Sequence, residues 1–159
     1  MEESVKILKV LGAVLIALAL GVAVAAPIGP MPGFFIGGEQ AQPPETWPDT
    51  SSVHEVKLKV PGGLPRVVII WIVDVAGDLY VVGDKGSGWV RKIGTASPVE
   101  LRLGDSTFAL NAVAVSEDPE AILGAWLDKY EPDYPEIVAG FRNDAAGADS
   151  AAVFRLERE

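Results

Sequence analysis

An uninterrupted apolar run near the N-terminus is the feature that most limits how this chain can fold. Residues Val10–Ala26 read VLGAVLIALALGVAVAA and contain no charged side chain. A helix of this length covers ~25 Å, close to the ~30 Å hydrocarbon core of a membrane. A helix that is apolar on every face needs a large protein around it to be buried, and this chain has only 159 residues. Residues 1–28 are therefore predicted to form a transmembrane helix or a signal segment.

Two interpretations of this segment remain open. Lys6 and Lys9 precede the run, and the positive-inside rule keeps that end in the cytoplasm, which puts the rest of the chain on the extracytoplasmic side. Ala23-Val24-Ala25 also has the small-residue pattern of a signal cleavage site, and cleavage there would make the domain a secreted one. Glu2 and Glu3 offset the positive charge ahead of the run, which favours an uncleaved single-pass anchor.

Residues 29–52 have the composition of a linker. The prolines in and next to this segment are Pro27, Pro30, Pro32, Pro43, Pro44 and Pro48, with glycines between them. Proline removes a hydrogen-bond donor and blocks helices, so we expect an extended tether. Phe34-Phe35-Ile36 is a small apolar cluster within it, which could pack on the following domain or lie at a lipid interface.

Short strands dominate residues 53–159. Alternating or β-branched apolar residues predict strands over 56–60, 66–73, 79–82, 98–103, 107–115 and 151–156. Helical spacing predicts helices over 89–93, 119–130 and 137–141, with Asp118 as a cap, a turn over 61–65 and a loop over 143–149. Six short strands with a few helices suit a small closed barrel, because closure removes exposed sheet edges. The expected fold class is mainly β with some α.

The composition excludes several kinds of function. Acidic residues number 22 against 13 basic ones, and a net charge of -9 argues against a nucleic-acid partner. Cysteine is absent and there is one histidine. We therefore predict no disulfide and no metal site.

The segment after the third expected strand is the best candidate for chemistry. Its candidate residues are Lys85, Gly86, Ser87, Gly88, Trp89, Arg91 and Lys92. Glycines let backbone N–H groups approach an anion, while Arg and Lys side chains attract it. An ordinary loop with solvated charges is the alternative interpretation. Trp71 and Trp89 could stack on a planar ring beside such a site, or pack in the core.

Several of these residues together resemble a known family. The matching pieces are Pro65-Arg66 and the strand to Trp71, Leu79-Tyr80-Val81-Val82, Gly86 to Arg91, Ser97 to Gly104, and Glu117-Asp118-Pro119. The stretch from Gly63 to Pro119 resembles the deazaflavin-dependent nitroreductases, a branch of the pyridoxamine-phosphate-oxidase-like FMN-binding split barrels. This resemblance implies a six-stranded split barrel that binds FMN or a deazaflavin (coenzyme F-420). It also implies that the residues from Lys85 to Lys92 hold the cofactor phosphate, and that Ile69 and Trp71 line the ring.

Two functions follow from the resemblance and the N-terminal segment. The first is a membrane-tethered flavin- or deazaflavin-dependent oxidoreductase that transfers hydride to a small acceptor, such as a lipophilic quinone or a nitro compound. The alternative is a non-catalytic binding or envelope-associated module that has lost its cofactor. The resemblance also implies a homodimer.

Overall fold

The computed structural model describes residues 2–25, 27, 32–63, 66–143 and 147–158. Its elements are, in chain order, α1 (Glu2–Ala25), β1 (Glu39–Ala41), β2 (Glu55–Val60), β3 (Arg66–Val75), β4 (Asp78–Asp84), α2 (Gly88–Ile93), β5 (Ala96–Leu103), β6 (Ser106–Ala114), α3 (Glu120–Tyr130), α4 (Pro135–Asn143), α5 (Gly147–Ser150) and β7 (Ala151–Arg158). The end of the turn expected over 61–65 and the middle of the loop expected over 143–149 lie outside the described residues.

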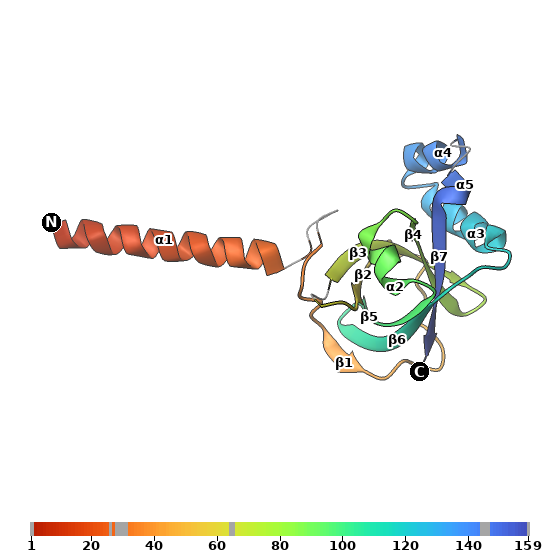
Figure 1. Ribbon diagram of the computed structural model, residues 1–159, viewed down its shortest axis with the longest axis horizontal. Coiled ribbons are helices and arrows are strands. Elements are labelled where there is room, and N and C mark those ends of the chain that lie inside the picture. Colours follow the sequence, from red (N-terminus) through yellow and green to blue (C-terminus); the bar gives the residue numbers. More distant parts are fainter. Residues whose placement is uncertain (1, 26, 28–31, 64–65, 144–146, 159) are drawn as a thin grey trace.

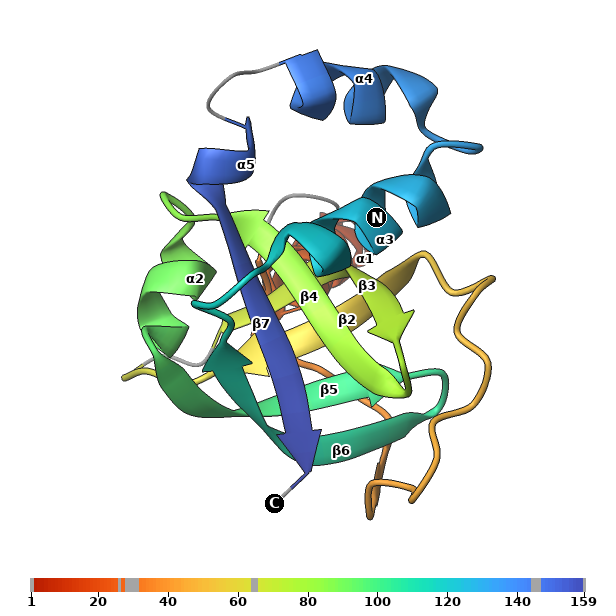
Figure 2. The same cartoon turned by 90° about the vertical axis from the view of Figure 1, so that its right-hand side faces the viewer.

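Strands β2 to β7 form a closed antiparallel barrel (Figures 1 and 2). The strand order is β6-β5-β2-β3-β4-β7, and a further pairing of β6 with β7 completes the circle. β2, β3 and β4 form an antiparallel meander. The prediction of a six-stranded barrel is confirmed, and each of its strands overlaps the range expected from the sequence.

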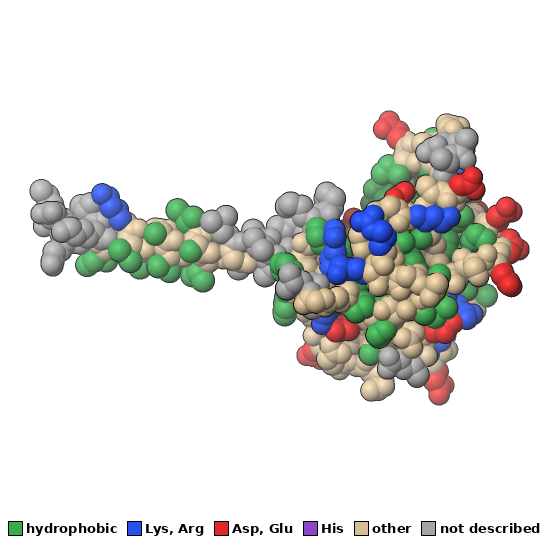
Figure 3. Space-filling view, in the orientation of Figure 1, with side chains coloured by type: hydrophobic (Ala, Val, Ile, Leu, Met, Phe, Trp, Pro, Cys, Tyr) green, Lys and Arg blue, Asp and Glu red, His purple; other side chains and the backbone are tan. Residues whose placement is uncertain are grey.

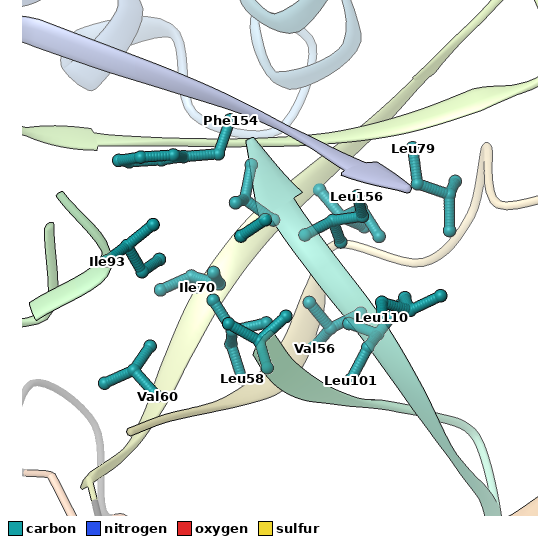
Figure 4. Close-up of a cluster of buried hydrophobic side chains, with 14 of the residues drawn as sticks. Val56, Leu58, Val60, Ile70, Leu79, Ile93, Leu101, Leu110, Phe154 and Leu156 are labelled. Carbon is teal, nitrogen blue, oxygen red and sulfur yellow. The ribbon is translucent and has the colours of Figure 1, made fainter. Parts of the chain in front are cut away.

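The alternation of β2 and β3 explains the barrel interior. Val56, Leu58 and Val60 of β2 point inward, while the lysines between them lie on the outer face. β3 carries apolar residues on both faces. One face lines the barrel interior, and the other is covered near its end by α3. Figure 4 shows part of the resulting interior, where Ile70 of β3 and Phe154 of β7 converge with side chains from β2, β5 and β6.

A second apolar cluster lies outside the barrel, beneath α3 and α4. Ile122, Leu123, Trp126 and Tyr130 of α3 pack against Val73 of β3, together with Tyr80, Val82, Val138 and Val153. This face of the helix expected over 119–130 covers the outer side of β3 near its end. The barrel interior and α3 thus cover opposite faces of β3.

The segment expected to be a tether instead packs on the barrel where it is described. Gly33 forms a two-way backbone bridge with Val67, and β1 adds a parallel strand beside β6. Trp47 is only 6% exposed and lies edge-on to Phe108, with ring centroids 5.3 Å apart. Burying Trp47 and pairing β1 hold this part of the proline- and glycine-rich segment against the barrel.

The N-terminal run forms the helix that its composition predicts. α1 spans Glu2–Ala25 and lies apart from the barrel in Figure 1. Figure 3 shows apolar side chains along it; the exposed large ones are Ile7, Val10, Leu11, Val14, Leu15, Ile16 and Leu18. Over the described residues, no helix meets the length and apolarity needed to cross a bilayer. The membrane anchor and the cleavage site stay predictions.

Candidate functional site

The loop between β4 and α2 is closed by its own hydrogen bonds. The Asp84 carboxylate accepts the N–H of Gly86 at 2.7 Å, and the Asp84 carbonyl accepts the N–H of Ser87 at 2.9 Å. A short polar side chain that bonds the backbone two residues on is the usual way to stabilise such a turn. Two of the N–H groups expected to bind an anion are therefore already paired inside the loop.

Two of the candidate cations are also tied to backbone carbonyls. Lys85 donates from Nζ to the Asp149 carbonyl at 2.6 Å, which anchors the loop to α5. Arg91 donates from Nη1 to the Gly86 carbonyl at 2.5 Å. Both side chains remain exposed, as does Lys92. Figure 3 shows lysine and arginine side chains gathered over α2, so this face is basic in a chain of net charge -9.

Arg66 joins this face, although the sequence reasoning placed no functional role on it. A Cβ on Gly88 would lie 2.7 Å from Arg66 Nη1, so the guanidinium rests directly on the first residue of α2. Its Nε atom is buried and has no hydrogen-bond partner among the described residues. A charged residue at the start of a strand that is then apolar from Val67 to Val73 was the signal that could have found it. We call Arg66, Ser87, Arg91 and Lys92 the α2 cationic site.

Ser87 completes the α2 cationic site with a hydroxyl that its helix does not use. It precedes α2 with extended backbone angles, yet its side chain makes no capping hydrogen bond. The hydroxyl and the neighbouring cations can all donate hydrogen bonds to an anion. The residues present therefore fit the phosphate of a cofactor through side chains rather than through loop N–H groups.

Trp89 belongs to the barrel core. It is 7% exposed, and its ring lies against Phe154 with centroids 5.8 Å apart. It also fills the space over Gly83, where a Cβ would come far inside van der Waals distance of the indole. Of the two interpretations of Trp89, stacking on a ligand ring or packing in the core, the structure agrees with packing in the core.

Trp71 lies in a different part of the molecule from the α2 cationic site. It is five residues beyond Arg66 on β3, or ~17 Å along the strand. Its indole stacks on Tyr130 of α3, with centroids 4.2 Å apart and rings 13° from parallel. Trp126 and Tyr134 flank the same ring. This aromatic stack attaches α3 to the barrel.

Lys129 and Tyr130 reinforce that attachment with buried polar bonds. Lys129 donates from Nζ to the carbonyls of Thr50, Val53 and Ile72 at 2.9, 2.9 and 2.7 Å. The Tyr130 hydroxyl accepts the Ile72 N–H at 2.9 Å. Burial lowers the pKa of Lys129 and raises the pKa of Tyr130. Both side chains therefore have a structural role, since their hydrogen-bonding groups are already paired with backbone atoms.

Ile69 lies on the outer face of the barrel, away from both of these regions. It contributes to a shallow pocket of about 320 Å³ with Lys57, Arg102, Glu55 and Gly104. The structure thus gathers the predicted loop residues around α2 and adds Arg66. It puts Trp71 beneath α3 and Ile69 in a separate pocket. The described residues contain no cluster of three side chains suited to a metal ion.

Comparisons with known proteins bear on the fold. No family model matches the chain, and no curated protein matches it. Among solved structures, the FAD and haem binding protein from Mycobacterium smegmatis aligns with a TM-score of 0.50 and 14% identity, over 69% of this chain and 62% of that one. The haem storage protein HutZ from Vibrio cholerae aligns with a TM-score of 0.49 and 16% identity, over 69% and 84%.

A conserved hypothetical protein from Mycobacterium tuberculosis aligns with a TM-score of 0.49 and 15% identity, over 75% of this chain and 86% of that one. The alignment covers 62% of the Mycobacterium smegmatis protein, so the chain spans less than two thirds of that protein's length. At these identities the likeness concerns the fold alone, and that fold is the split barrel.

Proposed function

We propose that this chain is a membrane-tethered oxidoreductase that binds a flavin-type cofactor, either FMN or a deazaflavin. The observation that carries the proposal is Arg66, whose guanidinium rests on Gly88 and whose buried Nε has no partner among the described residues. Leaving a buried donor unpaired costs ~1–3 kcal/mol, and a bound phosphate would remove that cost. The α2 cationic site therefore has the chemistry of a phosphate site.

Each residue of the α2 cationic site would have a separate role toward a cofactor phosphate. Arg66 offers a planar fork that matches phosphate oxygens, while Lys92 adds an exposed point charge. Ser87 offers a hydroxyl donor, and Arg91 needs only to turn from the Gly86 carbonyl to join them. When bound, a flavin-type cofactor supplies hydride transfer, and the protein supplies binding and orientation.

The place of the single histidine favours a flavin over haem. The Mycobacterium smegmatis protein with this fold is described as binding both FAD and haem. The single histidine of this chain, His54, is already engaged with Asp133 at 3.2 Å, and its ring lies 5.8 Å from those of Tyr130 and Tyr134. His54 thus lies with the aromatic cluster beneath α3 and not at the α2 cationic site, so that site offers no histidine to haem iron, and we propose the flavin.

The apolar α1 supports the tether, with the barrel on the extracytoplasmic side. Such a position would bring the barrel close to lipophilic acceptors such as quinones. A reporter fused at the C-terminus tests the topology, and we expect it to be active only outside the cytoplasm. Activity in the cytoplasm alone would contradict this orientation.

A non-catalytic module is the second candidate, and one observation favours it. The N–H groups of Gly86 and Ser87 and the side chains of Lys85 and Arg91 are satisfied within the chain. A loop that is complete without a ligand suits a barrel that has lost its cofactor. Binding measurements separate the two candidates.

The decisive experiment is a titration of the purified full chain with FMN, with a deazaflavin and with riboflavin. The fluorescence of each ligand measures its binding. Riboflavin is the matched ligand because it lacks the phosphate. We expect FMN to bind more tightly than riboflavin, and Arg66→Gln or Lys92→Gln to weaken FMN about ten-fold, because a hydrogen bond to a charged group contributes ~1.5–3 kcal/mol.

Riboflavin binding should be unchanged in both variants, since it makes no phosphate contact. Arg142→Gln removes an exposed arginine from α4 and is the control for a general loss of charge. A chain that binds neither FMN nor the deazaflavin would rule out the oxidoreductase and favour the non-catalytic module.

A further inference from the structure

Two like charges lie side by side on the outer face of the barrel. Lys57 of β2 is directly opposite Arg102 of β5, and on its other side it is opposite Ile69 of β3. The three side chains therefore form a row across three strands. Like charges opposite each other on neighbouring strands destabilise a sheet unless something neutralises them.

The carboxylates near this row are exposed and make no close ion pair with it among the described residues. Arg102 donates from Nε to the Gly104 carbonyl and from Nη1 to the Ile36 carbonyl, each at 3.1 Å. Its nearest carboxylate, the fully exposed Asp105, is 4.0 Å away. No carboxylate lies within salt-bridge distance of Lys57 among the described residues, although Glu55 lines the same pocket.

Two exposed aromatic side chains lie on the segment that reaches this pocket, because the next residue, Ile36, accepts a hydrogen bond from Arg102 through its carbonyl. Phe34 and Phe35 are 48% and 67% exposed. The ring of Phe35 and the guanidinium of Arg102 flank Gly37, where a Cβ would lie 3.3 Å from one and 2.5 Å from the other. The face therefore combines a cationic pair, the apolar floor of Ile69 and exposed aromatic rings. We call Phe34, Phe35, Lys57, Ile69 and Arg102 the linker-proximal face.

The apolar helix α1 is joined to this face by a short stretch of chain. The backbone between Ala25 and Phe34 spans at most ~30 Å when fully extended. If α1 associates with a bilayer, the face is held within that distance of the lipid headgroups. Aromatic rings beside basic side chains are the composition that membrane interfaces favour, and basic groups are drawn to anionic lipids.

We propose that the linker-proximal face docks on the membrane, with Lys57 and Arg102 contacting anionic lipid headgroups and Phe34 and Phe35 inserting at the interface. A headgroup would give both cations a close anionic partner, which Lys57 lacks among the described residues and which Arg102 has only at 4.0 Å in Asp105. The inference rests on the membrane tether of the proposed function and goes beyond it, because it states which face of the barrel meets the lipid. It is independent of the α2 cationic site and of any cofactor.

The absence of cysteine allows a clean test with the full chain, because a single introduced cysteine carries the only label. A nitroxide at Phe34→Cys is compared with one at Ala139→Cys, an exposed position on α4. Each protein is reconstituted in phosphatidylcholine vesicles with and without phosphatidylglycerol. Accessibility of the label to oxygen and to a water-soluble nickel chelate then reports its depth.

We expect the label at position 34 to lose nickel accessibility in vesicles that contain phosphatidylglycerol, while the label at 139 stays accessible in both. Lys57→Glu should abolish this dependence on anionic lipid. It should not harm folding, because it converts the like-charged pair into an ion pair with Arg102. Arg155→Glu is the matched control, since β7 lies three strands from β2 in either direction around the barrel.

Vesicle flotation separates this inference from the tether. A chain that floats with both kinds of vesicle, yet keeps the label at 34 as accessible to nickel as the label at 139, overturns the docking face and leaves the tether intact. Equal effects of Lys57→Glu and Arg155→Glu would also overturn it, because the attraction would then be general. A chain that floats with neither kind of vesicle overturns both the tether and the docking face.

Discussion

At the scale of single residues, the structure assigns roles that residue type alone leaves open. Trp89 lies in a glycine-rich segment with basic neighbours, a composition typical of an anion-binding loop. Its indole nevertheless points into the barrel, and Gly83 on β4 leaves the space that the ring fills. Arg66 shows the reverse: it lies at the start of a largely apolar strand, yet its guanidinium rests on α2 and belongs to the candidate site.

The contact between Gly83 and Trp89 predicts a large effect from one methyl group. Gly83→Ala would place a Cβ in steric overlap with the edge of the Trp89 indole, so the tryptophan must move and the core must repack. We expect a loss of ~1–3 kcal/mol in the free energy of unfolding, measured by urea denaturation. Gly124→Ala on α3 is the control, because nothing lies within 4 Å of its Cβ and a helical alanine should stabilise by ~0.5–1 kcal/mol. Equal effects of the two changes would contradict this account.

At the scale of elements, α3 is attached to the barrel by an apolar face that can be predicted from the sequence and by hydrogen bonds that cannot. Helical spacing identifies Ile122, Trp126 and Tyr130 as the buried side. It does not reveal that Lys129 reaches three backbone carbonyls, because its partners at Thr50, Val53 and Ile72 are distant in sequence. β1 was missed for a related reason: its three residues are all exposed and carry no alternation, and its pairing with β6 is non-local.

The buried hydroxyl of Tyr130 gives a test of this attachment. Tyr130→Phe keeps the stacking on Trp71 but leaves the Ile72 N–H without its acceptor. An unpaired buried donor costs ~1–3 kcal/mol, and we expect the urea midpoint to fall accordingly. Tyr134→Phe keeps an aromatic ring in the same cluster and should change stability far less, since no hydrogen bond of its hydroxyl is seen among the described residues. A midpoint for Tyr130→Phe equal to that of wild type would contradict the role of the hydroxyl.

At the scale of the whole molecule, the barrel includes more of the chain than its strands suggest. Residues 33–53 supply the bridge to Val67, the strand β1, the buried Trp47 and two of the three acceptors for Lys129. A segment rich in proline and glycine is thus part of the folded unit, because tertiary contacts offset its poor local propensities.

Truncation tests where the folded unit begins. We expect a chain that starts at residue 32 to keep the stability of the barrel. A chain that starts at residue 53 should lose ~3 kcal/mol or more, the usual cost of removing a buried tryptophan. Thermal and urea unfolding, followed by circular dichroism, measure the difference. Matching midpoints for the two truncated chains would show that residues 32–52 contribute nothing to the fold.

The order and kind of the barrel elements follow from local patterns that one sequence carries. Period-two alternation, β-branched runs and turn residues specify strands, and apolar spacing specifies α3, because each depends on neighbouring residues alone. The tertiary structure decided how the candidate residues divide among sites. Arg66 meets α2 and Trp71 stacks beneath α3, while Lys57 lies beside Arg102 only once β2 pairs with β5. Such meetings depend on strand register and barrel closure, which bring together side chains that are far apart in the chain.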